Sequence, residues 1–197
     1  IYISEMSIAP LNKIKIIPGT GLDIKKVKKQ CQTLTFKAKY IDFVARLIAE
    51  KGIYRFVYLR SNFKKYHPEI ANTYKFRVIT PQSDIDSISS KDLRYLNQLG
   101  IFLKPYLDNP YIYYSESKAL VIPTTYGEGL SRVALEAAYL GIPLLVSKNR
   151  GTEDLFPINY KYFMISENPT TLAKQLLEMI NDSEYFLKLK NQMKSLI

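Results

Sequence analysis

The stretch that decides the fold is residues 121–146, VIPTTYGEGLSRVALEAAYLGIPLLV. An apolar run, Ala119–Ile122, leads into it and stops at a proline, which is typical of the end of a strand. Ser131–Leu140 has a serine suited to a helix cap at its start, and Gly141 with a proline soon after it is a common helix end. A second short apolar run, Leu144–Val146, follows. This order of strand, helix and strand predicts a βαβ unit with parallel strands.

The same alternation continues in both directions along the chain. Short apolar runs that predict strands alternate with longer runs whose apolar residues recur at helical spacing. The other expected strands are Tyr40–Val44, Phe76–Ile79, a run at Phe102 and Leu103, and Tyr160–Ile165, and the other expected helices are Lys51–Tyr66, Ser89–Leu99, Thr170–Ile180 and Ser183–Met193. Strands that are apolar on both faces indicate an α/β fold, a Rossmann-like parallel sheet with helices on both faces.

Length and composition exclude several classes of protein. The chain has 197 residues, of which 47% are hydrophobic and 23% charged, so it is globular rather than disordered. No apolar run approaches the roughly 18 residues that cross a bilayer. Cys31 is the one cysteine, which excludes an internal disulfide and a zinc site built from several cysteines. Because the sequence starts at Ile1 without a methionine, we expect a domain taken from a longer protein.

The formal net charge of +10 raises the question of an anionic partner. The lysines are scattered except in the clusters Lys25–Lys29 and Lys188–Lys194, and neither cluster carries a nucleic-acid motif. We therefore expect no nucleic-acid partner. The lysines of the final helix (Lys188, Lys190 and Lys194) could help the parent protein dock on anionic lipid.

In parallel α/β sheets, ligands bind where strands end and lead into helices. Arg46 follows the strand that ends at Val44, and Lys51 lies near the start of the next helix. Both cations can converge on one crevice, and a helix N-terminus beside them would add to an anion site. The alternative is a surface arginine next to a solvated lysine.

The loop after Ile122 carries further polar groups. Glu128 lies in this loop, and Gly129 permits close approach of a ligand to the N–H groups of the first helical turn. A diphosphate can bind there while nearby carboxylates accept hydrogen bonds from sugar hydroxyls. Glu136 lies between apolar residues of the helix, so it needs partners if it is buried. The alternative for Glu136 is an exposed helix face.

Four segments in a fixed order carry a resemblance. Glu128 and Glu136, separated by seven residues, resemble the E-x7-E signature of retaining glycosyltransferases of family 4, the glycosyl transferases group 1. FVARLIAEKGI at Phe43–Ile53 resembles that family's donor loop, IIPGTGLDI at Ile16–Ile24 its hinge-side segment, and KNRGTEDLF at Lys148–Phe156 a later loop. The resemblance covers most of the chain and implies the C-terminal half of a GT-B fold.

The resemblance implies a role for each matching residue. Arg46 and Lys51 would hold the donor diphosphate and stabilise the charge that develops on the leaving phosphate. Glu128 would contact the hydroxyls of the transferred sugar near its anomeric centre, so these three residues form the expected catalytic group.

Three more residues complete the implied donor site. The N–H groups of Gly129 and Leu130 would face phosphate, and Glu136 would accept hydrogen bonds from the ribose hydroxyls. The resemblance also implies retention of anomeric configuration, no metal and no cofactor, with a UDP- or GDP-sugar as co-substrate.

The chain departs from the family where it would border the nucleobase. The family usually has glycine after the second and third strands, whereas this chain has Thr80-Pro81-Gln82 and Lys104-Pro105. Pro81, Lys104 and Pro105 are the residues we expect around the base. We expect residues 1–33 to form a hinge-side approach segment and residues 34–197 the nucleotide-sugar-binding domain, without the family's N-terminal acceptor domain.

The function we expect is transfer of a hexosyl group from a nucleoside-diphosphate sugar to a glycan or lipid-linked acceptor in surface polysaccharide biosynthesis. The acceptor would bind through the missing N-terminal domain, so the isolated domain would be inactive. We expect a cytoplasmic location with peripheral contact to the inner face of the membrane. Two alternatives stay open: a GT-B-fold nucleotide-sugar epimerase, and a non-enzymatic basic module that binds nucleic acid or an anionic membrane.

Overall fold

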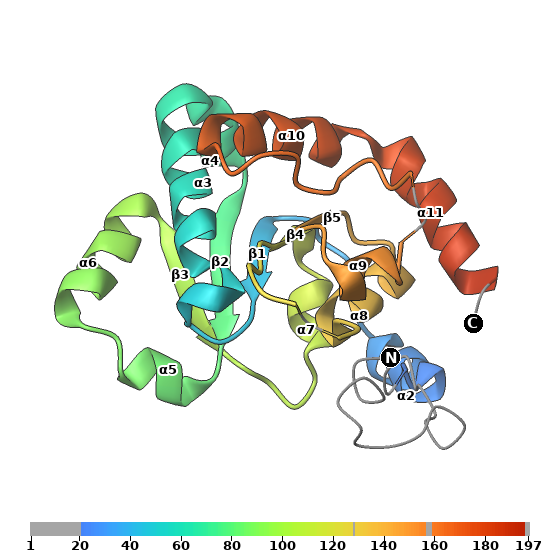
Figure 1. Ribbon diagram of the computed structural model, residues 1–197. Helices are drawn as coiled ribbons and strands as arrows, with labels where there is room; N and C mark the ends of the chain where they lie inside the picture. The colour runs from blue at the N-terminus through green and yellow to red at the C-terminus, as the bar shows by residue number, and fades with distance from the viewer. Residues whose placement is uncertain (1–20, 128, 157–158, 196–197) are drawn as a thin grey trace, which may run out of the picture.

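The computed structural model describes residues 21–127, 129–156 and 159–195, and it is an open sheet with helices packed around it (Figure 1). The strands are β1 (Tyr40–Val44), β2 (Lys75–Thr80), β3 (Ile101–Pro105), β4 (Ser117–Ile122) and β5 (Leu144–Val146). The helices are α2 (Ile24–Cys31), the 3-10 turn η2 (Ala49–Lys51), α3 (Ile53–Tyr66), α4 (Pro68–Thr73), α5 (Gln82–Asp86), α6 (Ser90–Leu99), α7 (Tyr111–Tyr114), α8 (Arg132–Leu140), α9 (Arg150–Glu153), α10 (Pro169–Asn181) and α11 (Ser183–Ser195).

The sheet is parallel, with the strand order β3-β2-β1-β4-β5. β1 pairs with β2 from Tyr40 opposite Lys75 to Val44 opposite Ile79, and its other edge pairs with β4. The chain moves outward from β1 to β3, returns to β4, and moves outward in the opposite direction to β5. The direction therefore reverses between β1 and β4, which is where sheets of this kind open a crevice for ligands.

Helices cover both faces of the sheet, as the sequence predicts. Right-handed crossovers place α3 and α6, which connect β1 to β2 and β2 to β3, on one face, and α10 packs against α3 there. α8 connects β4 to β5 in the opposite direction and so lies on the other face. On that side α11 packs against α8, and α2 packs against α7.

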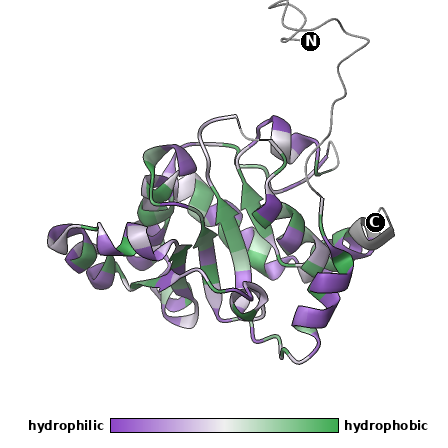
Figure 2. Ribbon diagram, turned by 90° about the horizontal axis from the view of Figure 1, so that it is seen from below, coloured by the Kyte–Doolittle hydropathy of each residue, from purple (hydrophilic) through white to green (hydrophobic). Residues whose placement is uncertain are grey.

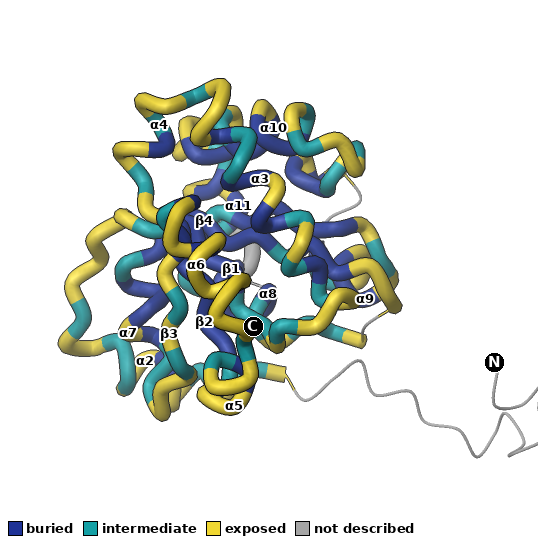
Figure 3. Tube along the Cα trace, turned by 90° about the vertical axis from the view of Figure 1, so that its left-hand side faces the viewer, coloured by how far each residue is buried: buried dark blue, intermediate teal, exposed yellow. Residues whose placement is uncertain are grey.

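The core lies between the sheet and these two helical layers. Figure 2 shows the strands as largely hydrophobic, and Figure 3 shows buried chain inside and exposed chain on the outer helices. A row of rings fastens α3 to the sheet: Phe56 lies 5.5 Å from both Phe43 and Phe76, and Phe63 lies 5.9 Å from Phe76, between ring centroids. All four side chains are buried.

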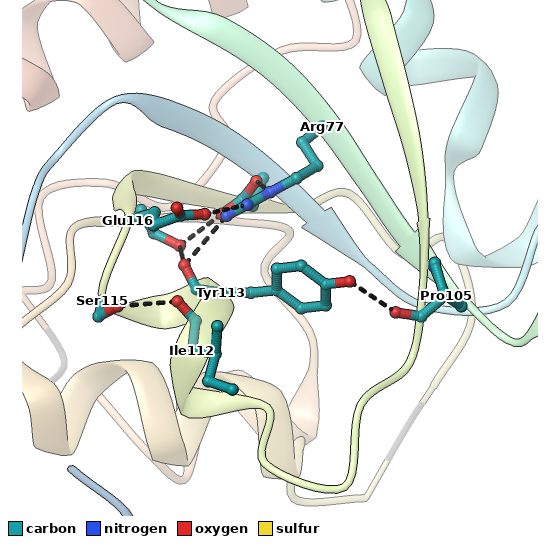
Figure 4. A network of polar contacts seen from close by, with 8 residues as sticks. Arg77, Pro105, Ile112, Tyr113, Ser115 and Glu116 are labelled. Atoms are coloured by element: carbon teal, nitrogen blue, oxygen red, sulfur yellow. Dashed lines mark hydrogen bonds and ion pairs between the residues drawn. The ribbon is translucent and has the colours of Figure 1, made fainter. Parts of the chain in front are cut away.

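A buried arginine joins β1, β2 and the segment before β4 (Figure 4). The Arg77 side chain is 2% exposed and donates through Nε and Nη2 to the fully buried carboxylate of Asp42, at 2.8 and 2.9 Å. Its Nη1 donates to Glu116 at 2.6 Å, and Nη2 also donates to the carbonyl of Tyr113 at 3.0 Å. The guanidinium carbon lies over the rings of Tyr40 and Tyr113, 3.9 and 4.7 Å from their centroids. This arginine has partners on every side, which is the condition for burying its charge.

Most of the predicted elements are confirmed to within a few residues, and one is wrong. Tyr160–Ile165 is not a strand, because it makes a single bridge, Phe163 to Val146. β5 is only three residues long, so it offers little edge for pairing. The aromatic residues of the segment pack through their rings instead, and Tyr162 stacks on Phe186 at 5.3 Å.

Smaller differences concern two element boundaries and the helices that the sequence does not predict. β3 extends through Pro105, so Lys104 and Pro105 lie in the strand and not after it. α3 starts at Ile53 rather than Lys51, because Gly52 has a positive φ of 81° that interrupts the helix. The sequence does not predict the helices α2, α4, α5, α7 and α9. Of these, α2 is capped by Asp23 and buries Val27 in the core. The first twenty residues of the expected approach segment lie outside the described residues.

Candidate functional site

A cleft of about 580 Å³ opens at the carboxyl ends of β1 and β4. Its walls come from the loop after β1, the loop after β4 and the first turn of α8. The described residues that line it are Phe43, Val44, Ala45, Arg46, Lys51, Tyr106, Val121, Ile122, Pro123, Thr124, Tyr126, Gly127, Gly129, Leu130, Ser131, Arg132 and Val133. The cleft therefore lies at the reversal point of the sheet, where ligands bind in open parallel α/β folds.

The two loops that form the cleft are fastened to each other. The backbone carbonyl of Glu50 accepts hydrogen bonds from the Thr125 N–H at 2.8 Å, the Thr124 hydroxyl at 3.1 Å and the Thr125 hydroxyl at 3.2 Å. Gly52 packs so closely on Pro123 that any Cβ there would collide with the Pro123 carbonyl. A glycine is required by this approach as well as by its φ, and the result fixes the η2 turn against the loop after β4.

Arg46 and Lys51 line the same cleft, so the structure brings the two predicted cations together. Arg46 is 62% exposed and its Nη2 lies 3.2 Å from the Asp84 carboxylate. The Lys51 Nζ lies 5.0 Å from the centroid of the Tyr126 ring, on the opposite loop. The sequence alone does not predict a role for Asp84, because a single aspartate in a five-residue helix carries no signal by itself.

The N-terminus of α8 supplies backbone donors to the cleft. Ser131 is the N-cap, and its hydroxyl accepts a hydrogen bond from the Ala134 N–H at 3.4 Å. Gly129 and Leu130 lie just before it and line the cleft, which agrees with their predicted place but leaves their contact with phosphate a prediction. The positive end of the α8 dipole therefore lies in the wall of the same cleft as Arg46 and Lys51. Glu128, the predicted catalytic carboxylate, lies outside the described residues.

Glu136 is buried rather than on an exposed helix face. Its residue is 4% exposed, and each carboxylate oxygen has a tyrosine hydroxyl as a donor: Tyr111 to Oε1 at 3.3 Å and Tyr114 to Oε2 at 3.1 Å. Arg132 Nε, one turn earlier, donates to Oε1 at 3.0 Å. Glu136 lines a second cavity of about 350 Å³ that adjoins the cleft, sharing Val44 and other residues with it. Its predicted contact with ribose stays a prediction.

The sequence does not predict a role for Tyr111 or Tyr114. Burial, and then the neighbouring Glu136 charge, raise the pKa of Tyr111 and of Tyr114 well above the ordinary value. Both hydroxyls therefore stay protonated and donate to Glu136. The run YIYY at 111–114 was visible, but its link to a helix that begins at Arg132 depends on how the faces of the fold pack.

The residues predicted around the nucleobase do not appear among those that line either cavity. Lys104 is exposed, Pro81 precedes α5, and the Pro105 carbonyl accepts a hydrogen bond from the Tyr113 hydroxyl at 3.0 Å. The residues that reach the second cavity from the segment after β3 are Tyr106, Leu107 and Pro110. The nucleobase assignment stays a prediction.

The fold and the cleft together identify the class of protein, which is a Rossmann-like α/β domain. Its cleft lies at the carboxyl ends of the strands and combines two cations with a helix N-terminus. Residues 25–195 match the family model described as glycosyl transferases group 1, and the chain belongs to this family. It is 25% identical over 188 residues to the capsular polysaccharide biosynthesis glycosyltransferase CapM of Staphylococcus aureus, covering 89% of this chain and 48% of CapM.

Solved structures agree on the fold. A variant of Staphylococcus aureus TarM in complex with fondaparinux, alpha-GlcNAc-glycerol and UDP matches with a TM-score of 0.66 and 16% identity, over 98% of this chain and 38% of TarM. The C-terminal domain of the group 1 glycosyl transferase LpcC from Francisella tularensis matches with a TM-score of 0.60 and 19% identity, over 92% of this chain and 96% of that domain. These neighbours confirm the expected fold as the C-terminal half of a GT-B fold.

The chain thus spans about half of the curated relative and a similar or smaller share of the longer solved proteins. Within the part of the chain that the structure describes, every helix is too short or too polar to cross a membrane.

Proposed function

We propose that this chain is the donor-binding domain of a retaining glycosyltransferase that transfers a hexosyl group from a nucleoside-diphosphate sugar. One observation carries the proposal: Arg46, Lys51 and the N-terminus of α8 line a single cleft, and the buried Glu136 lines the cavity beside it. Two cations and a row of backbone N–H groups suit a diphosphate. A carboxylate in an adjoining cavity suits a ribose.

The residues would divide the chemistry as follows. Arg46, Lys51 and the N–H groups of Gly129 and Leu130 hold the diphosphate and stabilise the negative charge that grows on it as the glycosidic bond to phosphate breaks. Glu136 accepts hydrogen bonds from the ribose hydroxyls. From the family resemblance, Glu128 contacts the transferred sugar. The same resemblance supports retention of configuration and a reaction without a metal or other cofactor.

UDP is the nucleotide that we propose first, with GDP as the competing candidate. The support is indirect, because UDP is bound in the TarM complex that shares this fold. The relation to CapM supports an acceptor in surface polysaccharide synthesis, as a glycan or a lipid-linked saccharide. The acceptor would bind to a part of the enzyme outside this chain.

Calorimetric titration of this chain with UDP, GDP and ADP tests the donor site. We expect UDP to bind, and we expect Arg46→Ala and Glu136→Gln each to weaken it by about tenfold, the effect of one charge-assisted hydrogen bond. Arg94→Ala is the matched control, because Arg94 is an exposed arginine of α6 that does not line the cleft. Tighter binding of GDP than of UDP would identify GDP as the donor nucleotide. Salt-dependent binding of any polyanion, unchanged in Arg46→Ala and Glu136→Gln, would instead favour the basic module.

A groove on another part of the molecule supports the peripheral membrane contact. It has a volume of about 360 Å³, and among the residues that line it are the exposed Phe36 and Leu187 and the lysines Lys118 and Lys190. None of the described residues in this lining is an aspartate or a glutamate. Apolar side chains beside lysines suit an anionic bilayer surface. We propose that the enzyme docks on the cytoplasmic face of the membrane through this groove.

Sedimentation with vesicles tests the docking. Vesicles that contain phosphatidylglycerol should retain the chain better than neutral vesicles, and Leu187→Ser together with Lys118→Ala should reduce this retention. Ile165→Ser is the control, because Ile165 is 74% exposed but lies outside the groove. Equal retention of the groove variant and the control would refute docking through this groove.

A further inference from the structure

A buried carboxylate holds the loop that presents Arg46. Asp84 belongs to the short helix α5, and its side chain is only 9% exposed. Its Oδ2 accepts a hydrogen bond from the Leu47 N–H at 2.8 Å and another from the Thr80 hydroxyl at 3.1 Å. Its Oδ1 accepts from Arg46 Nη2 at 3.2 Å. One side chain from the segment after β2 therefore fixes both the backbone and the side chain of the loop after β1.

The charge of this carboxylate is preserved at neutral pH. The hydrogen bond from Leu47, followed by those from Arg46 and Thr80, lowers the pKa of Asp84 below its ordinary value despite the burial. The side chain of the arginine that it holds is 62% exposed and lines the cleft, so Arg46 remains accessible to a ligand while its Nη2 is paired with Asp84. A long side chain that is held in this way loses less conformational freedom when it binds a ligand.

We propose that Asp84 is a positioning residue that orients Arg46 toward the donor diphosphate, an inference that rests on the proposed function. The loop after β2 reads Thr80-Pro81-Gln82 in place of the glycine that the family resemblance leads one to expect, and α5 follows directly. In this chain the segment after β2 contacts the loop after β1 through the hydrogen bonds of the Asp84 carboxylate. Asp84 acts through Arg46 and does not itself touch the ligand.

The direction in which a substitution of Asp84 changes the UDP affinity distinguishes a positioning role from a purely electrostatic one. If Asp84 only contributed negative charge near an anion site, its removal would tighten the binding of UDP. If it positions Arg46, its removal weakens the binding of UDP. We expect the UDP dissociation constant to rise about tenfold in Asp84→Ala and about threefold in Asp84→Asn, in which the amide oxygen still accepts from Leu47.

The control is Asp86→Asn. Asp86 is an exposed aspartate of the same helix that accepts a hydrogen bond from Gln82 at 2.6 Å and does not contact Arg46. We expect its UDP affinity to equal that of the unchanged chain. Thermal unfolding of each variant shows whether the fold is retained, and Asp84→Asn serves if Asp84→Ala does not fold.

A double-mutant cycle decides whether Asp84 acts through Arg46. The Asp84 substitution should weaken UDP binding in the unchanged chain and have little further effect when Arg46 is already alanine. An equal effect in both backgrounds, or tighter binding by the Asp84 variants, overturns the proposal. If Arg46→Ala by itself leaves UDP affinity unchanged, the proposed donor site fails first, so the two failures are distinguishable.

Discussion

Replacement of Arg77 by methionine is the perturbation that tests the buried ion cluster most directly. Methionine has a similar length and an apolar side chain, so the packing volume changes little while the charge and all donors are lost. The substitution leaves the Asp42 carboxylate, which is 0% exposed, without its two hydrogen bonds from the guanidinium. The half-buried Glu116 loses an ion pair of 2.6 Å at the same time.

The expected loss of stability is about 3–5 kcal/mol, the range observed when one partner of a buried ion pair is removed. Urea unfolding followed by circular dichroism measures it. With a urea dependence of about 2 kcal/mol per molar for a chain of this size, the midpoint should fall by roughly 1.5–2.5 M. Arg94→Met is the control, because Arg94 is exposed on α6 and should change stability by less than about 0.5 kcal/mol.

Acidification should recover part of the loss. Burial already raises the pKa of Asp42, and Arg77 opposes this shift through its hydrogen bonds and charge. Without Arg77 the folded-state pKa rises further above the unfolded value, which is about 3.9. The folded state then binds the proton more tightly, so the variant gains stability as pH falls through the folded pKa, by up to about 1.4 kcal/mol per pH unit.

Two results would refute this reasoning. One is a loss below about 1 kcal/mol at pH 7, which would mean that water or rearrangement satisfies Asp42. The other is a loss that stays the same as the pH is lowered from 7 toward the unfolded aspartate pKa. The double substitution Asp42→Asn with Arg77→Met removes the stranded charge, so it should be more stable than Arg77→Met alone.

Three further predictions concern the cleft. Gly52→Ala should lower stability by about 1–3 kcal/mol in urea unfolding, because the added methyl group meets the Pro123 carbonyl and the positive φ is strained; an unchanged midpoint would contradict the close approach. Tyr114→Phe leaves one oxygen of Glu136 without its tyrosine donor and should cost about 1–3 kcal/mol by the same measurement, whereas Tyr54→Phe, on an exposed ring, should be neutral. The stability that Asp84 contributes is present above the unfolded aspartate pKa and is lost as pH falls through its lower folded pKa, so its carboxyl carbon in an NMR titration should move at lower pH than that of a peptide aspartate.

The sequence predicts the fold well because apolar runs and helical spacing are both local patterns. These patterns identify the strands and the longer helices α3, α6, α8, α10 and α11, whereas the shorter helices are not predicted. The cap at Ser131 with the glycine at Gly141 places α8 to within a residue. The error at Tyr160–Ile165 has a tertiary origin: an aromatic run satisfies the pattern of a strand, but a strand also needs a partner edge, and β5 provides too little of one.

In the candidate site, too, the residues close together in the chain could be predicted and the contacts that depend on packing could not. Arg46 and Lys51 could be placed in one cleft because both lie in the short segment that connects β1 to α3. The tyrosine partners of Glu136 and the contact of Asp84 with Leu47 could not, since they join segments 22 to 37 residues apart whose meeting depends on packing. A carboxylate between apolar residues indicates that it has hydrogen-bonding partners if it is buried, but the sequence does not show which residues they are.

The fastening of Glu50 to Thr124 and Thr125, together with the glycine that lets Pro123 approach, has a consequence for engineering. The two walls of the cleft are a single transplantable unit rather than two independent loops. A chimera that imports the loop after β4 from a relative with a different donor must import the η2 turn and its glycine as well. Otherwise the η2 turn, which carries Lys51, will no longer pack against the loop after β4.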